Sequence, residues 1–239
     1  MNALFERCRL FGHRGNSQQY LENTLDAFEA CIQDGIDGIE LDVQRTRCGT
    51  LVVFHDFTLS RLAGVDRRIC EMEWEELKEI PIGGDQRIPT LEQVFALIGN
   101  RLLYDIELKA EGIGRTGLEE GVFKAIEDAG LQGNVLVSSF NPILLRRFKR
   151  RARNTIPTAV IYSRSKEVPT FLHEGQGRFL SRPTLLKPER EQALPMIERG
   201  KAVVVWTVDD EAEAQLLVAK GAKGIISNCP AALAHLFRG

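Results

Sequence analysis

The stretch GIELDVQ, residues 38–44, alternates strictly between apolar and polar side chains. Its apolar residues, on one side of an extended chain, are Ile39, Leu41 and Val43. A period of two is typical of a β-strand with two different faces, because successive side chains point in opposite directions. The pattern leaves two environments open for Glu40 and Asp42. In the first, both carboxylates face water. In the second, the two carboxylates, separated by about 7 Å of strand rise, bind a cation.

Similar short apolar runs recur along the chain and alternate with amphipathic stretches. They predict strands at 8–14, 38–44, 50–55, 101–109, 134–140, 156–162, 201–208 and 222–228, with a weaker one at 177–181. Strands that alternate with helices favour a parallel sheet covered by helices. About eight such units in roughly 250 residues is the size of a TIM barrel, so the predicted fold is an α/β TIM (β/α)8 barrel.

Helix-start and helix-stop signals mark the segments between these strands. Asn23 is a candidate N-cap, with Asp26 three residues later in a capping-box position, and Gly35 ends that helix. Another helix begins at Asn141, with Pro142 at its first position. Further helices are predicted at about 187–199 and 209–220.

The stretch 56–88 interrupts this alternation and is predicted to be a small insertion after the second strand unit. The chain has 239 residues and no Gly/Ser/Pro-rich linker, which predicts a single domain spanning 1–239. A hydrophobic content of 44% and a charged content of 27% are those of an ordinary globular protein with enough apolar surface to bury.

The overall charge gives no reason to expect a polyanionic partner. A net charge of -2 and a pI near 6.2 exclude a general attraction to nucleic acid or to anionic membranes. The basic run at 146–151 is interleaved with apolar residues and is predicted to be the solvated face of a helix. His173 and His235 lie away from every motif and receive no role.

The five cysteines are scattered and contain no Cys-x-x-Cys pair, which argues against a disulfide framework and a zinc site. They suit a reducing compartment. No apolar run approaches the roughly 18 residues of a membrane-spanning helix, and charges lie where a secretory signal would need apolar residues. We therefore expect a cytoplasmic protein, and its oligomeric state, a homo-oligomer included, stays open.

Several predicted strands end in side chains that can take part in chemistry. In a TIM barrel the C-terminal strand ends form the site, so these side chains are expected to meet. They are His13 and Arg14, Glu40 and Asp42, His55 and Asp56, Glu107 and Lys109, Trp206, and Asn228. Any one of them alone is more often structural. Their recurrence at successive strand ends of one fold is what indicates a site.

The residue types form a coherent set. Three of them are carboxylates, Glu40, Asp42 and Glu107, and carboxylate oxygens suit Mg²⁺ or Ca²⁺ better than zinc. Arg14 and Lys109 add positive charge for an anion beside the metal. The two histidines can give or take a proton near neutral pH. Together these groups indicate hydrolysis or internal transfer at a phosphate ester.

The order of these motifs resembles one family. FGHRGNSQQYLENTLDAFEACIQDGIDGIELDVQRTRCGTLVVFHD, residues 11–56, resembles the opening of the glycerophosphodiester phosphodiesterases, and IPTLEQVF, IELK, SSF, VWTV and GIISNCP follow in order. The resemblance spans about residues 10 to 230. The chain departs from the family pattern at Leu21, at Cys48 and at Ser227-Asn228, and every candidate catalytic residue is retained.

The resemblance implies a TIM barrel with a small insertion, a divalent cation, either Mg²⁺ or Ca²⁺, and cleavage of a small-molecule glycerophosphodiester to sn-glycerol 3-phosphate and an alcohol. It also implies a role for each matching residue. His13 and His55 would be the acid/base pair, Glu40, Asp42 and Glu107 the metal ligands, Arg14 and Lys109 the phosphate contacts, and Trp206 part of the substrate cleft.

Three other functions compete with this one. A lysophospholipase D of the same fold would need an apolar groove near the barrel mouth. The apolar residues of 56–88, Leu59, Leu62, Met72, Trp74 and Leu77, suit helix packing at least as well. A barrel that binds phosphorylated ligands without turnover has no need of two histidines, and a glycosidase with paired carboxylates leaves the histidines and Lys109 unexplained. The sequence does not indicate which head-group alcohol is released from the substrate or which divalent cation is preferred.

Overall fold

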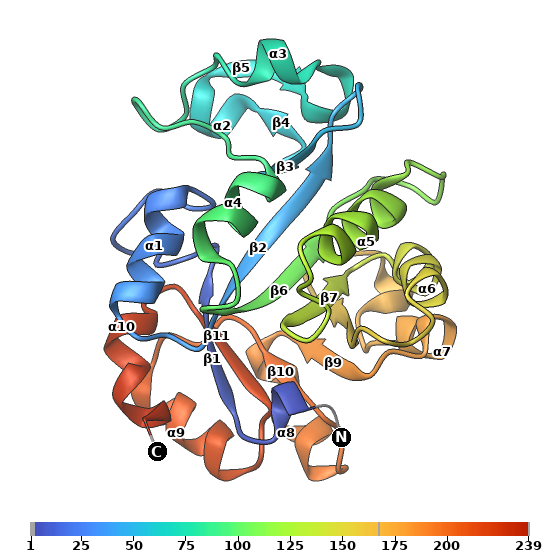
Figure 1. Cartoon of the computed structure of the whole chain (residues 1–239). Coiled ribbons are helices and arrows are strands. Elements are labelled where there is room, and N and C mark those ends of the chain that lie inside the picture. The colour runs from blue at the N-terminus through green and yellow to red at the C-terminus, as the bar shows by residue number, and fades with distance from the viewer. Residues whose placement is uncertain (1–2, 167, 239) are drawn as a thin grey trace.

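In the computed structural model, which describes residues 3–166 and 168–238, eight parallel strands form a nearly closed barrel (Figure 1). Around the barrel they are β10 (Val204–Val205), β11 (Gly224–Ser227), β1 (Arg9–His13), β2 (Gly38–Arg45), β6 (Leu103–Leu108), β7 (Val135–Ser139), β8 (Thr158–Tyr162) and β9 (Leu185–Pro188). Two parallel bridges, Leu186 with Val203 and Glu189 with Trp206, join β9 to the chain around β10. The predicted TIM barrel is confirmed.

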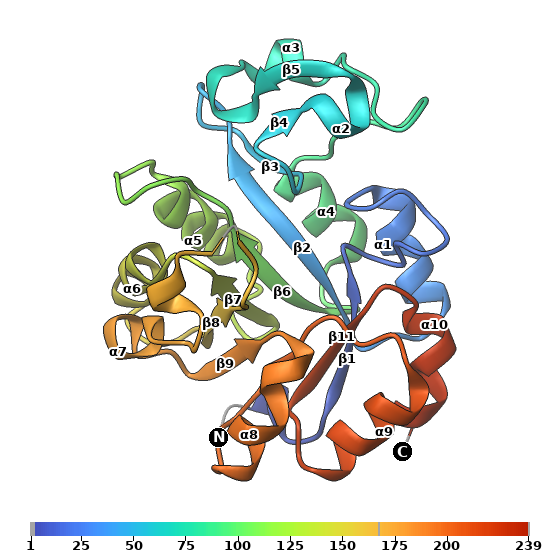
Figure 2. The same cartoon turned by 180° about the vertical axis from the view of Figure 1, so that it is seen from behind.

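Helices cover the outside of the barrel, as the two opposite views show (Figures 1 and 2). They are α1 (Leu25–Gln33), α4 (Leu91–Ile98), α5 (Leu118–Asp128), α6 (Pro142–Arg151), α7 (Gly177–Ser181), α8 (Ala193–Glu198), α9 (Glu211–Ala219) and α10 (Pro230–Leu233). Short 3-10 turns lie at η1 (Ala3–Phe5), η3 (Thr170–Leu172), η4 (Arg190–Gln192) and η5 (Ala234–Phe237). Within the described residues, no helix has the length and apolarity needed to cross a membrane.

Strand β2 buries both of its faces. Ile39, Leu41 and Val43 belong to the core between the barrel and its helices, together with Phe28 of α1 and Val94 of α4. The alternate side chains of β2 therefore lie on the opposite, inner face, and the polar ones are Glu40, Asp42 and Gln44. Of the two environments that the sequence left open for Glu40 and Asp42, solvent and the protein interior, the structure has the interior.

The barrel interior is layered from an apolar floor to a polar mouth. The floor consists of Phe11, Leu136, Leu185, Val204 and Ile226, closed from below by Leu4 and Phe5 of η1. Side chains two residues apart on a strand share a face, so each floor residue is followed at the mouth by another inward residue. These followers are His13, Ser138, Lys187, Trp206 and Asn228. The floor holds the strands together and leaves the polar layer at their C-terminal ends.

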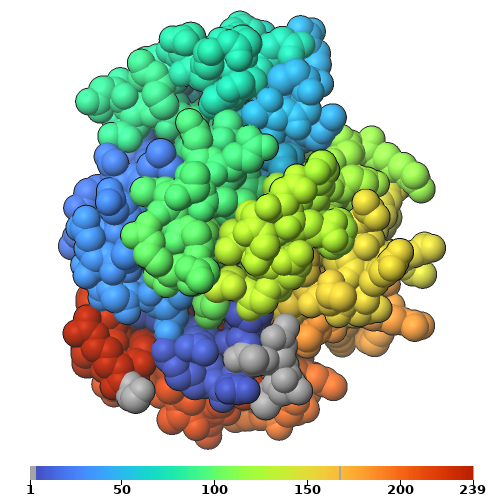
Figure 3. Space-filling view, viewed as in Figure 1, coloured from blue at the N-terminus to red at the C-terminus, as the bar shows by residue number. Residues whose placement is uncertain are grey.

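A lobe leaves the barrel directly after β2 and projects beyond the end of that strand (Figures 1 and 3). It contains β3 (Leu51–Val53), β4 (Thr58–Leu59), α2 (Ser60–Ala63), β5 (Val65–Arg68), η2 (Ile69–Glu71) and α3 (Trp74–Leu77). Strand β3 pairs antiparallel with β2. The run 50–55, predicted among the alternating strands, is therefore a return strand at the base of the lobe and not a barrel strand.

The lobe has its own apolar core, which includes Leu59, Met72 and Leu77. Leu62 and Trp74 are partly buried against it. These five side chains pack inside the lobe, so they do not form the apolar groove that a lysophospholipase D would need there. A single domain over 1–239 stays a prediction, and residues 1–2, 167 and 239 lie outside the described residues.

Two predictions for residues 177–199, in the C-terminal half of the chain, are wrong. Residues 177–181, predicted as a weak strand, form α7, and the strand is β9 at Leu185–Pro188. The helix predicted from 187 begins only at Ala193, after η4. Short apolar runs fit a buried strand and a buried helix equally well, so packing against neighbours decided between them. The helix at 209–220 is confirmed as α9.

The cap of α1 also differs from the prediction. The Oγ1 atom of Thr24 accepts a hydrogen bond from the Ala27 amide at 3.3 Å, and Asn23 lies one residue earlier with a φ of 57°. Both residues are good caps, and Asn23 is drawn away by a tertiary hydrogen bond to Asp42. The predicted end at Gly35, with φ 68°, and the Asn141 cap of α6 are confirmed.

Because Thr24 caps α1, we expect Thr24→Ala to lower the free energy of unfolding by about 1 kcal/mol. Thr24→Ser keeps the hydroxyl and should retain most of the stability. Urea unfolding followed by circular dichroism measures both. Equal losses in the two variants would show that the hydroxyl does not cap the helix.

Candidate active site

The strand register brings the predicted site residues together. His13 of β1 pairs with Glu40 of β2, and Asp42 of β2 pairs with Glu107 of β6. A cavity of about 1220 Å³ lies at this end of the barrel. All eight site residues predicted from the sequence line it, namely His13, Arg14, Glu40, Asp42, His55, Glu107, Lys109 and Trp206.

Three carboxylates form the centre of the polar half of this cavity. One oxygen each of Glu40, Asp42 and Glu107 lies within 4.8 Å of the other two, and the three residues are 2%, 1% and 7% exposed. Three hard oxygen donors at this spacing fit a Mg²⁺ or Ca²⁺ ion, and they lack the nitrogen or sulfur donors that zinc prefers. The residues present therefore fit a divalent cation.

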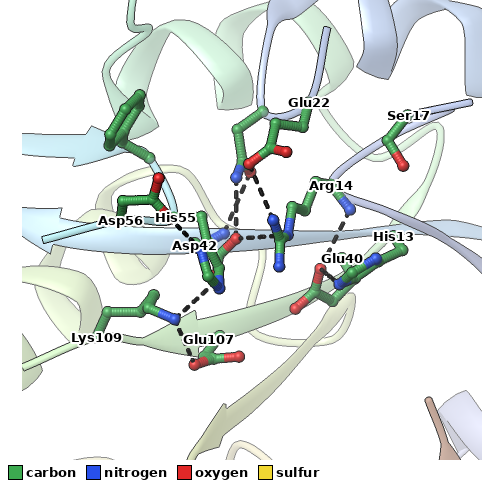
Figure 4. A network of polar contacts seen from close by, with 12 residues as sticks. His13, Arg14, Ser17, Glu22, Glu40, Asp42, His55, Asp56, Glu107 and Lys109 are labelled. Carbon is green, nitrogen blue, oxygen red and sulfur yellow. Dashed lines mark hydrogen bonds and ion pairs between the residues drawn. The ribbon is translucent and has the colours of Figure 1, made fainter. Parts of the chain in front are cut away.

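Two cationic side chains flank these carboxylates (Figure 4). The Nζ atom of Lys109 lies 3.6 Å from Asp42 and 3.3 Å from Glu107, and Nε of Arg14 lies 3.5 Å from Asp42. Burial alone would raise the pKa of Asp42, but Lys109, His55 and Arg14 outweigh burial and hold that pKa far below its usual range. Asp42 is therefore ionised at every physiological pH.

A third cation, Lys187, lies deep in the cavity and was not predicted. Its Nζ atom is 2.9 Å from Asp105, 3.4 Å from Glu40 and 3.2 Å from the Ser138 hydroxyl. Burial would lower the pKa of Lys187, but the carboxylates of Asp105 and Glu40 outweigh it and raise that pKa. Lys187 lies two residues after the floor residue Leu185 on the same strand, so its side chain also points into the barrel. It was missed from the sequence because the strand was predicted at 177–181 and not at Leu185–Pro188.

The ion-paired groups around the cavity carry more negative than positive charge. Six carboxylates, those of Glu22, Glu40, Asp42, Asp56, Asp105 and Glu107, are paired with Arg14, Arg61, Lys109 and Lys187. Leaving out the two histidines, six carboxylates against four cations leave an excess of two negative charges in these ion pairs. A divalent cation would balance that excess, which agrees with the donor chemistry of the three carboxylates.

His13 is oriented by a neutral amide. Its Nδ1 atom lies 2.7 Å from Oδ1 of Asn228. The side-chain amide and the backbone N–H of Asn228 both donate to Asp209 at 2.8 Å, which leaves Oδ1 as the atom that accepts from His13. Nδ1 of His13 therefore carries the proton in the neutral ring, and Nε2 faces Glu40 at 4.0 Å.

His55 is oriented by a carboxylate. Its Nδ1 atom lies 2.7 Å from Oδ1 of Asp56, whose other oxygen accepts from Arg61 at 2.6 Å. Arg61 of the lobe also pairs with Glu22 at 2.6 Å, and Glu22 pairs with Arg14 at 2.9 Å. This chain of ion pairs connects the His55 side of the cavity to Arg14, which follows His13.

Asn23 is a second residue whose role was missed. Its side-chain amide donates to Oδ2 of Asp42 at 2.9 Å, and its Oδ1 accepts from the Asp42 amide at 3.3 Å. This pair of bonds holds the carboxylate from a loop that precedes α1. Asn23 stands in the segment Glu22-Asn23-Thr24, directly before a helix, and this position favoured a local capping role over a contact with Asp42.

Trp206 forms part of the cavity wall. Its indole N–H donates to the Lys187 carbonyl at 3.1 Å, and its ring packs edge-to-face against Phe140 at 5.6 Å. Both contacts fix the plane of the ring. Trp206 is thus placed where a substrate-lining residue was predicted, and its role stays a prediction.

Known proteins resemble this chain in sequence and in fold. Residues 13–232 match the model of the glycerophosphoryl diester phosphodiesterase family. A glycerophosphodiester phosphodiesterase of Caldanaerobacter subterraneus subsp. tengcongensis is 32% identical over 96% of this chain and 97% of its own length. An Oleispira antarctica phosphodiesterase, solved with the product sn-glycerol-3-phosphate, is 26% identical with a TM-score of 0.79 over the full length of both chains. The Thermotoga maritima glycerophosphodiester phosphodiesterase is 27% identical, with a TM-score of 0.75 over 97% of this chain and 99% of its own.

The ion pairs of Glu22 generate a pH prediction. Burial would raise the pKa of Glu22, but Arg61 and Arg14 outweigh burial and lower that pKa. A lowered folded-state pKa stabilises the fold above the unfolded value of about 4.3 and ceases to do so as pH falls through the folded value. We therefore expect Glu22→Gln to cost about 2 kcal/mol at pH 7 and progressively less below pH ~4.

Urea unfolding of both proteins between pH 3 and pH 7, in EDTA, measures this difference. Glu29→Gln, which removes an exposed acid from α1, is the matched control for the loss of one charge. A cost of Glu22→Gln that stays constant with pH would contradict the prediction.

Proposed function

Because this chain belongs to the glycerophosphoryl diester phosphodiesterase family, we propose that it hydrolyses glycerophosphodiesters to sn-glycerol 3-phosphate and an alcohol, using a divalent cation and two histidines. The chain is a phosphodiesterase of this family. The observation that carries the finer proposal is the convergence of three buried carboxylates and two separately oriented histidines on one cavity. The product bound to the Oleispira relative supports the choice of substrate.

Glu40, Asp42 and Glu107 would hold the cation. A bound Mg²⁺ or Ca²⁺ would supply charge stabilisation to the phosphoryl oxygens, which is worth several kcal/mol in the transition state. Asn23 keeps Asp42 in place, and Lys187 keeps Glu40 in place. These neighbours make the carboxylate arrangement rigid before any ligand binds.

His13 and His55 would be the acid/base pair. One takes the proton from the attacking oxygen, and the other gives a proton to the oxygen of the leaving alcohol. Each ring is held at Nδ1, His13 by Asn228 and His55 by Asp56, so each has its Nε2 atom free to exchange a proton. A set of two oriented histidines is not needed by a barrel that only binds phosphorylated ligands.

Arg14 and Lys109 would hold the phosphodiester. Both are largely buried beside Asp42, and the surrounding carboxylates raise the pKa of each against the lowering effect of burial. They therefore stay charged over the whole physiological range. Trp206 would line the cleft beside them. A cytoplasmic location, the absence of a nucleic-acid partner, and the oligomeric state remain predictions.

The first test concerns the histidines. We expect His13→Ala and His55→Ala each to lower kcat/KM for glycerophosphocholine by about 10²- to 10⁴-fold, because each removes one proton-transfer group. Enzymatic detection of released sn-glycerol 3-phosphate measures the rate. His235→Ala is the matched control, since His235 is exposed and does not line the cavity. Full activity in either cavity variant would refute the acid/base assignment.

The second test concerns the cation. We expect EDTA to abolish activity, and Glu107→Gln to weaken Mg²⁺ or Ca²⁺ binding by at least about tenfold in calorimetric titrations. Glu111→Gln is the matched control, because Glu111 lines the same cavity, pairs with Arg68 and lies outside the group of three carboxylates. An unchanged metal titration in Glu107→Gln would refute this ligand.

A further inference from the structure

A second, smaller cavity lies at the opposite end of the barrel from the three carboxylates. It has a volume of about 340 Å³ and is lined by α7, by the start of β9 and by the residues that precede β10. In both cartoon views α7 lies beside β9 (Figures 1 and 2). One wall is Leu185, the first residue of β9 and a member of the apolar floor. The floor therefore separates this cavity from the catalytic one.

The side chains around the smaller cavity are positively charged. Arg178, Arg182 and Lys201 line it, and no aspartate or glutamate is among its described lining residues. Nη1 of Arg178 donates to the backbone carbonyls of residues 174 and 175 at 2.8 Å each, which fixes the guanidinium without neutralising it. The nearby acids Glu174 and Glu191 pair with other arginines, outside this cavity.

The neighbouring helix α6 adds positive charge to the same region. Lys149 of α6 donates to the backbone carbonyl of Arg182. Burial and the Arg182 guanidinium both lower the pKa of Lys149, and no carboxylate offsets them. No aspartate or glutamate occurs in residues 129–166 or 175–188, the stretches that contain α6 and α7. A chain with a net charge of -2 thus concentrates cations at one place.

Arg182 has a backbone conformation that arginine rarely adopts. It is the C-cap of α7, with φ 47° and ψ 59°, in the left-handed region where helices usually end on glycine. Any side chain in this region costs energy that glycine would avoid. The strained residue carries one of the three charges that line the cavity. This combination indicates that the charge of Arg182 has a use beyond ending the helix.

We propose that this cavity is a second, non-catalytic binding site for the phosphate group of a small phosphorylated anion. Guanidinium groups bind phosphate oxygens through paired N–H donors, and a lysine ammonium adds a point charge. A volume of about 340 Å³ is at the small end of the ~300–1,000 Å³ of ordinary ligand sites, so it suits a small molecule. The inference goes beyond the proposed function, because it involves none of the residues that act there.

Three kinds of molecule present a phosphate group of this size. Inorganic phosphate is the group alone, sn-glycerol 3-phosphate adds a small polar tail, and a nucleoside monophosphate adds a flat base. Phe179 lines the cavity and is 70% exposed, with the Arg178 guanidinium 4.4 Å from the centre of its ring. Bases stack on exposed aromatic rings. The relative affinities of the three molecules therefore report what the phosphate is attached to.

Calorimetric titrations with inorganic phosphate, sn-glycerol 3-phosphate and adenosine monophosphate test the proposal. They are made in EDTA and at about 150 mM NaCl, where isolated surface charges are largely screened. We expect Arg182→Gln and Lys201→Gln each to weaken the binding of phosphate by about tenfold, because each removes a charged hydrogen-bond donor. A preference for adenosine monophosphate that Phe179→Ser removes would identify a nucleotide, and equal affinities would identify the phosphate group alone.

Arg199→Gln is the matched control. Arg199 is an exposed cation two residues before Lys201 and does not line the cavity, so its substitution should leave the affinity unchanged. Arg14→Gln removes a cation of the catalytic cavity and should leave the binding that depends on Arg182 unchanged. Thermal unfolding of each variant confirms that it is folded. The readout is binding without turnover, so a failure of the proposed function leaves this test intact.

Three results would overturn the inference. The wild-type protein binds none of the three molecules at this salt concentration. Arg199→Gln weakens binding as much as Arg182→Gln and Lys201→Gln do, which would reveal a general attraction by positive charge. Binding is lost in Arg14→Gln but kept in both cavity variants, which would place the phosphate in the catalytic cavity alone.

Discussion

The parallel pairing of β2 with β1 and β6 is the constraint on which the site depends. Its register sets His13 beside Glu40 and Asp42 beside Glu107. A slip of one residue in β2 would turn both carboxylates outward into the apolar layer under the helices. The hydrophobic packing of Ile39, Leu41 and Val43 against that layer opposes such a slip. The packing of the apolar face of β2 thus keeps its carboxylate face turned into the barrel.

Enclosing so many carboxylates is tolerable because cations and hydrogen-bond donors reach each of them from different elements. Lys187 comes from β9, Arg14 from the loop after β1 and Asn23 from the loop before α1. Arg61 reaches in from the lobe and connects Glu22 to Asp56. Isolated buried charges would cost several kcal/mol each. The lobe is therefore part of the charge balance of the site.

The cavity combines this charged centre with an apolar wall that the lobe does not supply. The apolar residues of the lobe are consumed by its own core. The apolar side chains on the other side of the cavity, Ile113, Phe171 and Leu180, stay exposed. The cavity therefore has a charged half beside an apolar half, and different elements of the barrel build the two.

The sequence by itself determined the barrel, the alternating strands and eight residues that line one cavity, because period-two patterning and strand-end chemistry are local properties. Other features followed only from the tertiary structure. Asn23 does not cap α1, because its side chain is hydrogen-bonded to Asp42. Lys187 is recognised as a cavity residue only from the position of β9 in the barrel. The apolar wall of the cavity brings together Ile113 and Phe171, which lie far apart in the chain. Such contacts depend on which elements become neighbours, and that is decided by packing of the whole barrel, since short-range propensities do not encode it.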